Sequence, residues 1–263
     1  MIKILVEQRY LKILNLMQGD GTVKVSTLKK VLNVSSETIR RDLENMESRG
    51  LLKRTYGGAL LIKEDNLDNL LYTSFNQRES KNIESKIEVA ELATQFIEEG
   101  QLVALDSGTT SLELARAIKR KFKLLTVITN SLIIANELAG VNGITLVLTG
   151  GVYKDDEAAF ISDISASFFS KLSIQTFFLT TCGISVEKGV TYQRMDEISI
   201  QEKMMEASDK IFVIADNSKL GVNSLVKMCD VNRVSMIITD SYATDEQIKP
   251  FKDKGIKIVK PTK

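Results

Sequence analysis

The sequence predicts an α/β protein with two parts: a small, mostly helical N-terminal part and a larger part built on a mostly parallel sheet. Three observations predict this. The chain has 263 residues, of which 43% are hydrophobic, so it can bury one small and one large core. From residue 85 onward, apolar runs of four to six residues alternate with helical patterns, as expected for parallel strands joined by crossover helices. Positive charge is concentrated before residue 61, which sets this part apart from the rest.

Composition excludes several classes of function. No apolar run approaches the roughly 20 residues of a membrane span, and charged residues interrupt the N-terminus, so we expect neither a membrane segment nor a secretory signal. The two cysteines, Cys182 and Cys229, form no pattern of disulfides or metal ligands, which favours a cytoplasmic location. Histidine is absent, so Ser-His-Asp catalysis and imidazole metal sites cannot be built within this chain. We therefore assign no catalytic residue, no metal and no cofactor.

Residues 1–60 contain three helical patterns followed by a short ribbon. Each pattern places apolar residues on one helix face: Tyr10, Leu14 and Met17 in the first, Leu28, Val31 and Leu32 in the second, and Ile39, Leu43 and Met46 in the third. Ser35 is placed to cap the third helix and Gly50 to end it. Residues 51–59 then have the two glycines and the basic residues of a tight β-ribbon.

The third helix and the ribbon carry basic side chains outside the apolar stripe. A helix, a short turn, a second helix and a basic ribbon predict a winged helix-turn-helix, whose last helix enters a DNA major groove. The alternative is a solvated charged surface. Residues 1–60 hold 11 Lys/Arg and 6 Asp/Glu, a net charge of +5, while the whole chain is +1 and the remainder therefore −4. This separation of charge favours a surface that binds phosphates.

The rest of the chain is divided into a linker and a second domain. Residues 61–84 are polar and irregular, and we interpret them as the linker between domains at residues 1–60 and 85–263. In the second domain the expected strands are 102–105, 124–129, 144–148, 176–179, 211–215, 234–239 and 256–259. The expected helices are 87–97, 112–118, 132–138, 164–172, 197–207 and 245–254.

Small hydroxyl residues and glycines follow the predicted strands. In an open α/β sheet the ligand crevice lies beyond the carboxyl ends of the strands, and backbone amides at helix N-termini attract anions there. The residues at these ends are Asp106, Ser107, Gly108, Thr109 and Thr110; Thr129, Asn130 and Ser131; Gly150 and Gly151; Gly183; and Asp216 and Lys219. Together they favour a small phosphorylated sugar or polyol. Taken singly, the glycines are also consistent with turns, the hydroxyls with helix caps, and Asp216 with a surface ion pair to Lys219. The chain has neither G-x-x-x-x-G-K-[ST] nor G-x-G-x-x-G, so nucleotide binding is not supported.

Two groups of motifs resemble the DeoR family of bacterial transcriptional regulators. The first comprises Ser-Ser-Glu-Thr-Ile-Arg-Arg-Asp-Leu at residues 35–43 and Gly-Leu-Leu-Lys-Arg-Thr-Tyr-Gly-Gly-Ala at residues 50–59. The second comprises Asp106-Ser-Gly-Thr-Thr110, Thr129-Asn-Ser131, Thr149-Gly-Gly151, Gly183-Ile184, Gly189-Val-Thr191 and Asp216-Asn-Ser-Lys219. The family usually has His where this chain has Tyr56, Gly where it has Ser162, and Asp where it has Gln175.

The resemblance implies a winged helix-turn-helix followed by a sensor domain similar to sugar-phosphate isomerases. It implies a DNA-binding repressor controlled by a sugar phosphate. Because a single winged helix gives little specificity, we expect a homo-oligomer, dimer or tetramer, that pairs half-sites on operator DNA. The expected DNA contacts are Ser35, Ser36, Glu37, Thr38, Arg40, Arg41, Lys53, Arg54 and Tyr56. The main rival is a sugar-phosphate isomerase with an appended helical domain, and a third class is a binding protein without DNA contact.

Overall fold

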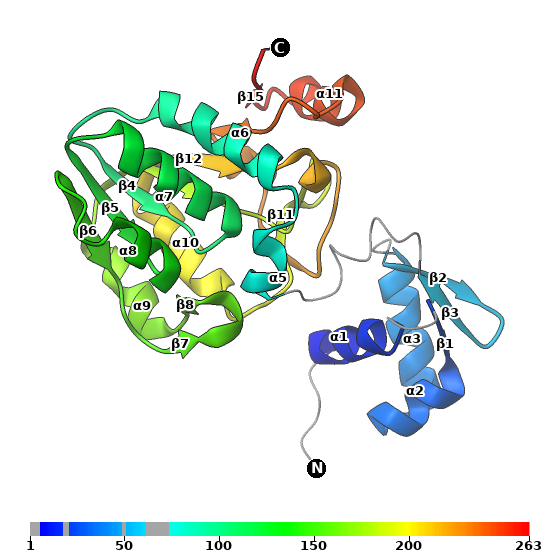
Figure 1. Ribbon diagram of the computed structural model, residues 1–263. Helices are drawn as coiled ribbons and strands as arrows, with labels where there is room; N and C mark the ends of the chain where they lie inside the picture. The colour runs from blue at the N-terminus through cyan, green and yellow to red at the C-terminus, as the bar shows by residue number, and fades with distance from the viewer. Residues whose placement is uncertain (1–5, 18–20, 49–50, 62–73, 263) are drawn as a thin grey trace. The chain divides into compact units, whose positions relative to one another are not determined.

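The computed structural model describes residues 6–17, 21–48, 51–61 and 74–262. The chain divides into two compact units, Met1–Thr73 with Asn223–Leu225 and Ser74–Val222 with Val226–Lys263 (Figure 1). Of the linker predicted at residues 61–84, residues 62–73 lie outside the described residues, whereas residues 74–84 form one short helix and the start of another.

The N-terminal unit contains three helices and a small antiparallel sheet. Its elements are α1 (Val6–Met17), β1 (Thr22–Lys24), α2 (Val25–Leu32), α3 (Ser36–Ser48), β2 (Leu52–Thr55) and β3 (Gly58–Leu61), with the strands in the order β1-β3-β2. The apolar stripes predicted for the first and third helices are buried. In α2, Leu28 and Leu32 are buried but Val31 is 55% exposed, so its predicted place in the stripe is wrong. The predicted helix end at Gly50 lies outside the described residues.

Gly58 fixes the close approach of β1 to the ribbon. A Cβ atom at this position would lie 2.2 Å from the carbonyl oxygen of Val23, because β3 pairs with β1 as well as with β2. The turn between β2 and β3 consists of Tyr56 and Gly57, and Gly57 has a φ of +89°. One glycine therefore permits the turn, and the next permits the third strand.

The second unit is organised on a seven-stranded parallel sheet. Its strands are β4 (Leu102–Leu105), β5 (Leu125–Thr129), β6 (Ile144–Leu148), β9 (Ile174–Leu179), β12 (Ser208–Ile214), β14 (Met236–Ile238) and β15 (Ile258–Val259). They lie in the order β15-β14-β12-β9-β4-β5-β6, and every neighbouring pair is parallel. The prediction of a mostly parallel sheet is confirmed.

Helices cover both faces of this sheet. The helices α6 (Ile83–Ala93), α7 (Thr109–Lys121) and α8 (Leu132–Leu138) pack on one face with Val103, Leu105 and Phe178. The helices α9 (Asp163–Phe168), α10 (Ile198–Glu206) and α11 (Asp245–Asp253) contribute to the other core, with Ala104 and Phe177. Alternate residues of each strand thus enter opposite cores, as the period of two in a strand requires.

Several short elements were not predicted. They are β1, α5 (Phe75–Glu79), the pair β7 (Tyr153–Lys154) and β8 (Ala159–Phe160), and the three-stranded sheet of β10 (Gly183–Ser185), β11 (Gly189–Tyr192) and β13 (Val226–Cys229). Short 3-10 turns, η2 (Asp155–Glu157) and η4 (Asn217–Lys219), lie in two of the loops discussed below. Within the described residues, no helix is long and apolar enough to cross a bilayer.

Candidate DNA interface and anion-binding site

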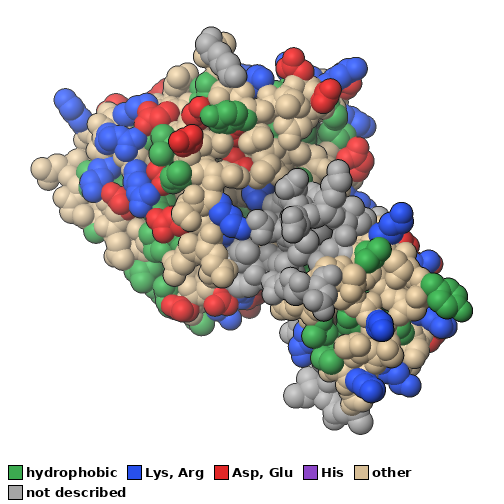
Figure 2. Space-filling model, turned by 45° about the vertical axis from the view of Figure 1, so that its right-hand side comes forward, with side chains coloured by type: hydrophobic (Ala, Val, Ile, Leu, Met, Phe, Trp, Pro, Cys, Tyr) green, Lys and Arg blue, Asp and Glu red, His purple; other side chains and the backbone are tan. Residues whose placement is uncertain are grey.

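The helix α3 presents basic side chains on the face opposite its buried stripe. Ile39, Leu43 and Met46 are buried, while Arg40 and Arg41 are exposed. At the N-terminus of α3, the Ser35 hydroxyl accepts a hydrogen bond from the Thr38 amide at 3.1 Å, which confirms the predicted cap. The free face of α3 therefore begins at an ordered, capped helix end. Lys and Arg side chains are spread over the visible face of this unit (Figure 2).

A buried ion pair holds α3 against α1. The guanidinium of Arg9 donates to both carboxylate oxygens of Asp42, at 2.7 and 2.8 Å. The Asp42 side chain is 4% exposed and that of Arg9 is 11% exposed, so the pair is shielded from water. Asp42 therefore lies on the buried side of α3, directly after Arg41 in sequence but facing the other way.

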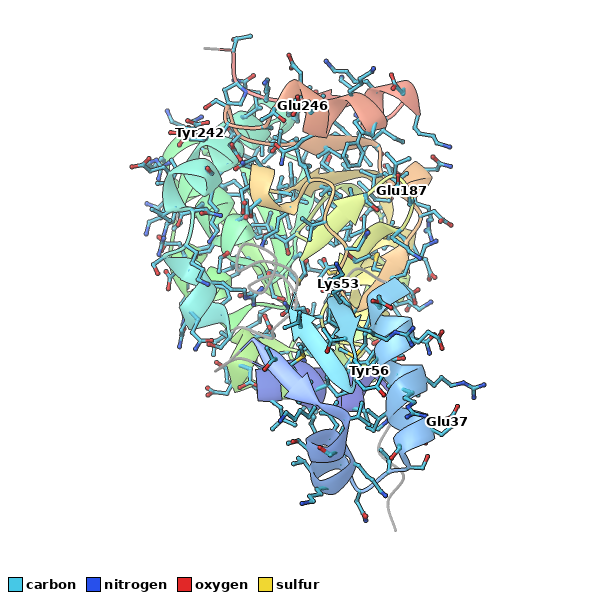
Figure 3. All side chains as sticks on the ribbon, turned by 90° about the vertical axis from the view of Figure 1, so that its right-hand side faces the viewer. Glu37, Lys53, Tyr56, Glu187, Tyr242 and Glu246 are labelled. Atoms are coloured by element: carbon cyan, nitrogen blue, oxygen red, sulfur yellow. The ribbon has the colours of Figure 1, made fainter. Side chains whose placement is uncertain are left out.

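The exposed and the bound polar side chains of the ribbon differ in their surroundings. Tyr56 is fully exposed at the turn, and Lys53 is exposed along β2; Figure 3 shows both side chains together with Glu37 of α3. The backbone N–H and the Nε of Arg54, in contrast, each donate to Glu47 of α3 at 2.8 Å. The hydrogen bond from the Arg54 backbone N–H is the largest cause that lowers the pKa of Glu47. Arg54 thus ties the ribbon to α3, a contact that the sequence did not predict.

In the second unit, the predicted strand ends meet at one edge of the sheet around Asp106. The carboxylate of Asp106 is buried and accepts from Thr180 Oγ1 at 2.6 Å, the Tyr192 hydroxyl at 2.9 Å and Gln201 Nε2 at 3.3 Å. It also accepts from the Ser107 amide at 2.8 Å. Burial, and then the charge of Asp106, raise the pKa of Tyr192 well above its ordinary value. Asp106 therefore holds together the loops after β4 and β9, the strand β11 and the helix α10.

Two of the predicted loops begin helices. Gly108 is the N-cap of α7, and a Cβ atom there would lie 2.3 Å from Thr180 Oγ1, so this loop packs closely on the next. The Ser131 hydroxyl caps α8 by accepting from the Ile134 amide at 3.4 Å. The side-chain Nδ2 of Asn130 donates to the carbonyl oxygen of Phe160 at 3.2 Å. These contacts orient the N-termini of α7 and α8 toward the same edge as the strand ends.

The loop after β6 depends on its glycines. Gly150 and Gly151 have φ of +65° and +113°, and a Cβ on Gly151 would lie 2.2 Å from the Ser165 hydroxyl. Ser162, where the family usually has Gly, caps α9 by accepting from the Ser165 amide at 3.3 Å. Gln175, where the family usually has Asp, accepts from the Leu102 amide at 2.7 Å. Both departures thus have structural partners in this chain.

The turn after β12 carries both charged residues predicted for the anion site. The Asp216 carboxylate caps η4 by accepting from the Ser218 amide at 3.0 Å, and it also accepts from Asn82 Nδ2 at 3.3 Å. Lys219 is half-buried in the same turn. Gly183, also predicted for the site, approaches the carbonyl oxygen of Val222, where a Cβ would lie only 2.5 Å away.

Four charged residues near these loops were not predicted from the sequence. Lys86 is 4% exposed; burial lowers its pKa to about 8, with the nearby Asp216 acting in the opposite direction. Arg78 forms an ion pair with Glu157 of η2. Burial, and then the charge of Glu157, raise the pKa of Glu197 well above its ordinary value. Arg78 and Lys86 lie in or just after the predicted linker, where no sequence signal indicated contact with the strand ends.

A separate hollow of about 380 Å³ lies between the β10–β11 hairpin and α11. Two carboxylates, Glu187 and Glu246, line it from different elements (Figure 3). This lining lacks the basic side chains of the sheet edge and does not favour an anion. Among the described residues, no cluster of three or more Cys, Asp or Glu side chains is arranged to hold a metal ion.

Comparison with known proteins identifies the two units. The DeoR-like helix-turn-helix domain matches residues 9–65, and the DeoR C terminal sensor domain matches residues 81–241. The chain belongs to the DeoR family. It is 30% identical over 233 residues to the L-fucose operon activator of Haemophilus influenzae, with 89% of this chain and 91% of that protein covered. It is also 30% identical over 238 residues to the transcriptional repressor AccR of Agrobacterium fabrum, with 89% and 90% covered.

The DeoR assignment confirms the expectation of a DNA-binding transcriptional regulator rather than an enzyme. Among solved structures, the chain is similar to ribose 5-phosphate isomerase from Plasmodium falciparum. The match covers 53% of this chain and 54% of the isomerase chain, with a TM-score of 0.39 and 20% identity. The relatives named above are regulators, so the rival interpretation as an isomerase with an added helical domain is not supported.

Proposed function

We propose that this DeoR-family protein is a repressor of a sugar-metabolism operon. Its affinity for operator DNA changes when a phosphorylated sugar binds the second unit. In this proposal the N-terminal unit binds DNA, with Arg40 and Arg41 of α3 in the major groove and Lys53 and Tyr56 on the ribbon. The assembly is a cytoplasmic homo-oligomer that presents two such units to paired half-sites.

The observation that carries the effector assignment is the convergence of anion-attracting groups at one sheet edge. The N-termini of α7 and α8, the glycine loop after β6 and the turn of Lys219 follow the carboxyl ends of parallel strands in the same sheet. Backbone amides at helix N-termini and a lysine suit a phosphate, while the hydroxyl and amide side chains of Thr110 and Asn130 suit sugar hydroxyls. The relative named as an L-fucose operon activator supports a sugar operon, and AccR supports repression.

The decisive experiment measures binding to the promoter fragment of the protein's own operon by fluorescence anisotropy. The titration is repeated with D-glucose 6-phosphate, D-fructose 1-phosphate, D-fructose 6-phosphate and D-ribose 5-phosphate, and with inorganic phosphate as the comparison. Binding that weakens with rising salt and responds to one sugar phosphate supports the proposal. Operator affinity that is unchanged by every sugar phosphate contradicts the effector assignment. Isomerase turnover without DNA binding contradicts the proposed function as a repressor.

Lys219→Ala tests the phosphate contact directly. We expect this variant to bind operator DNA as the parent does, because Lys219 lies in the second unit. We expect its response to the sugar phosphate to weaken by tenfold or more, about 1.4 kcal/mol, because a charge-assisted contact is lost. Lys210→Ala, an exposed lysine of β12, is the matched control. A response equal to that of the parent would remove Lys219 from the phosphate site.

A further inference from the structure

The residues that follow the junction between the two units form an ordered segment against the sheet edge. This entry segment, residues 74–88, comprises α5 and the first turns of α6 (Figure 1). Ser74 and Gln77 form a capping box at the start of α5, and Phe75 is 1% exposed in the core of the second unit. The segment is therefore anchored to the sensor core at its first residues, directly after residues 62–73 in the chain.

The same segment contacts the turn that carries Lys219. Asn82 is the N-cap of α6 and has a φ of 52°, in the left-handed region. Its Nδ2 lies 3.3 Å from Asp216 Oδ1 and 3.4 Å from the Ser218 hydroxyl. Asn82 thus bridges the entry segment and η4 through two neighbouring acceptors.

Lys86 forms the second link. Its ammonium is buried and donates to the carbonyl oxygens of Arg78 at 2.5 Å and of Glu79 at 3.4 Å, at the C-terminal end of α5. The charges closest in effect are those of Asp216, which stabilises the ammonium, and of Lys219, which destabilises it. An anion that neutralises Lys219 therefore favours the charged form of Lys86, whose ammonium donates to the carbonyl oxygens at the end of α5.

We propose that Asn82 and Lys86 couple effector binding at the Asp216–Lys219 turn to the position of α5, and through it to the N-terminal unit. The inference rests on the proposed function and adds the residues that transmit the signal. A phosphate on Lys219 removes the repulsion on Lys86 and fixes the turn that Asn82 contacts, so the phosphate and the closed entry segment stabilise each other. If α5 is displaced in the operator complex, operator binding weakens effector binding by the same factor by which the effector weakens operator binding.

The experiment uses the full chain and compares three variants. Asn82→Gly removes the amide without strain, since glycine tolerates the positive φ. Lys86→Met removes the charge but keeps most of the buried length. Glu84→Gln, an exposed position of the same helix, is the control. For each protein, the operator Kd is measured with and without saturating sugar phosphate, using the panel member that binds the parent most tightly, and the Kd of that compound is measured by calorimetry.

We expect the parent and Glu84→Gln to change operator Kd by roughly 5- to 150-fold on effector binding, the usual range of allosteric coupling. Asn82→Gly and Lys86→Met should reduce this ratio to less than about 2-fold, while operator Kd without effector stays within about 3-fold of the parent. An unchanged ratio in both variants overturns the inference but leaves the proposed function intact. A parent that binds no sugar phosphate contradicts both.

Hydrogen exchange on the parent protein provides a test that does not depend on the variants folding. The sugar phosphate should slow amide exchange in residues 74–88 as well as in residues 216–220, whereas the same concentration of sodium chloride should not. Protection confined to residues 216–220 would show a bound turn without transmission, and would overturn the inference.

Discussion

Arg40 and Arg41 are adjacent in sequence and both exposed, yet they point from α3 at angles about 100° apart, as neighbouring helical residues must. We therefore expect them to have different tasks at the DNA. Arg41→Ala should weaken operator binding by about 1–3 kcal/mol and relax the preference at one base pair, if its guanidinium reads a base edge. Anisotropy titrations against the operator and single-base variants of it measure both effects.

The control for this variant is an arginine outside the N-terminal unit. Arg233→Ala changes the net charge equally, at an exposed position of the second unit. It should leave operator affinity and base preference unchanged. If Arg41→Ala weakens binding equally for all sequences, Arg41 contacts phosphate instead, and unchanged affinity would remove it from the interface.

Lys86 gives the protein a stability that depends on pH. Burial lowers its pKa from 10.5 to about 8, with Asp216 and Glu113 opposing this shift and Lys219 and Arg78 adding to it. The folded protein releases this proton near pH 8, whereas the unfolded chain keeps it to higher pH. The unfolded state thus binds more protons in between, and the contribution of Lys86 to the free energy of unfolding rises with pH.

Urea unfolding of the parent and of Lys86→Met measures this contribution. The free energy of unfolding of the parent minus that of the variant should increase by about 2–3 kcal/mol between about pH 7.5 and about pH 10. A difference independent of pH would mean that the ammonium titrates alike in the folded and unfolded states. The subtraction removes groups that both proteins share.

Residues whose role depends on local pattern could be predicted, and those whose role depends on tertiary contacts could not. Ser35 was predicted as a cap because small hydroxyl residues before an apolar stripe have that local function. Lys86 and Gln201 come close to the residues at the strand ends only through the fold, since the first follows the predicted linker and the second lies in a distant helix. Neither belongs to a sequence motif that would indicate an ionic or polar site.

At the scale of elements, α3 is connected to α1 by the ion pair of Asp42 with Arg9, and to the ribbon by the ion pairs of Glu47 and Glu44 with Arg54. Burial decides their strength. Asp42→Asn removes the carboxylate of the shielded pair that Asp42 forms with the guanidinium of Arg9. We expect it to lower the free energy of unfolding of the N-terminal unit by about 3 kcal/mol. Glu47→Gln alters the exposed pair with Arg54 and should change stability far less, because water screens that pair.

Thermal unfolding followed by circular dichroism compares the two variants, and operator binding adds a second readout. Glu47→Gln keeps an acceptor for the backbone N–H of Arg54 but loses the carboxylate. The ribbon should therefore stay folded, while the Arg54 guanidinium keeps its longer contact of 3.8 Å to Glu44. A larger loss of stability in Glu47→Gln than in Asp42→Asn would show that burial does not rank these contacts.

The elements that could be predicted are those whose pattern is long enough to repeat. The strands β4 and β5 are mostly buried apolar runs, β6 is an apolar run at the edge of the sheet, and α7 has a full amphipathic stripe. The missed strands β7, β8, β10 and β11 are two to four residues long and pair by antiparallel contacts within loops. Helix α5 has only five residues, and its capping box lies in a polar stretch that resembles a linker. Period alone cannot identify elements this short.

At the scale of the whole molecule, the opposite charges of the two parts of the sequence have different consequences. Residues 1–60 carry a net +5 and the remainder −4, so attraction to DNA is concentrated in the N-terminal part. The acidic remainder disfavours contact between the second unit and the phosphate backbone. Salt should therefore weaken operator binding mainly through the few phosphates that the N-terminal unit neutralises.

The number of copies on the operator can be read from this salt dependence. Each lysine that contacts a phosphate contributes about 0.9 to the slope of log K against log salt concentration, and an oligomer contributes once for every bound copy. Lys53→Ala should therefore reduce the slope by about 1.8 if two copies engage paired half-sites, and by about 0.9 if one copy binds. Anisotropy titrations over a series of potassium chloride concentrations measure the slope, and Lys210→Ala, an exposed lysine of β12, should leave it unchanged. A reduction of the slope near 0.9 would contradict binding to paired half-sites, because the slope measures the number of phosphate contacts. It would leave the other predicted contacts of the interface untouched.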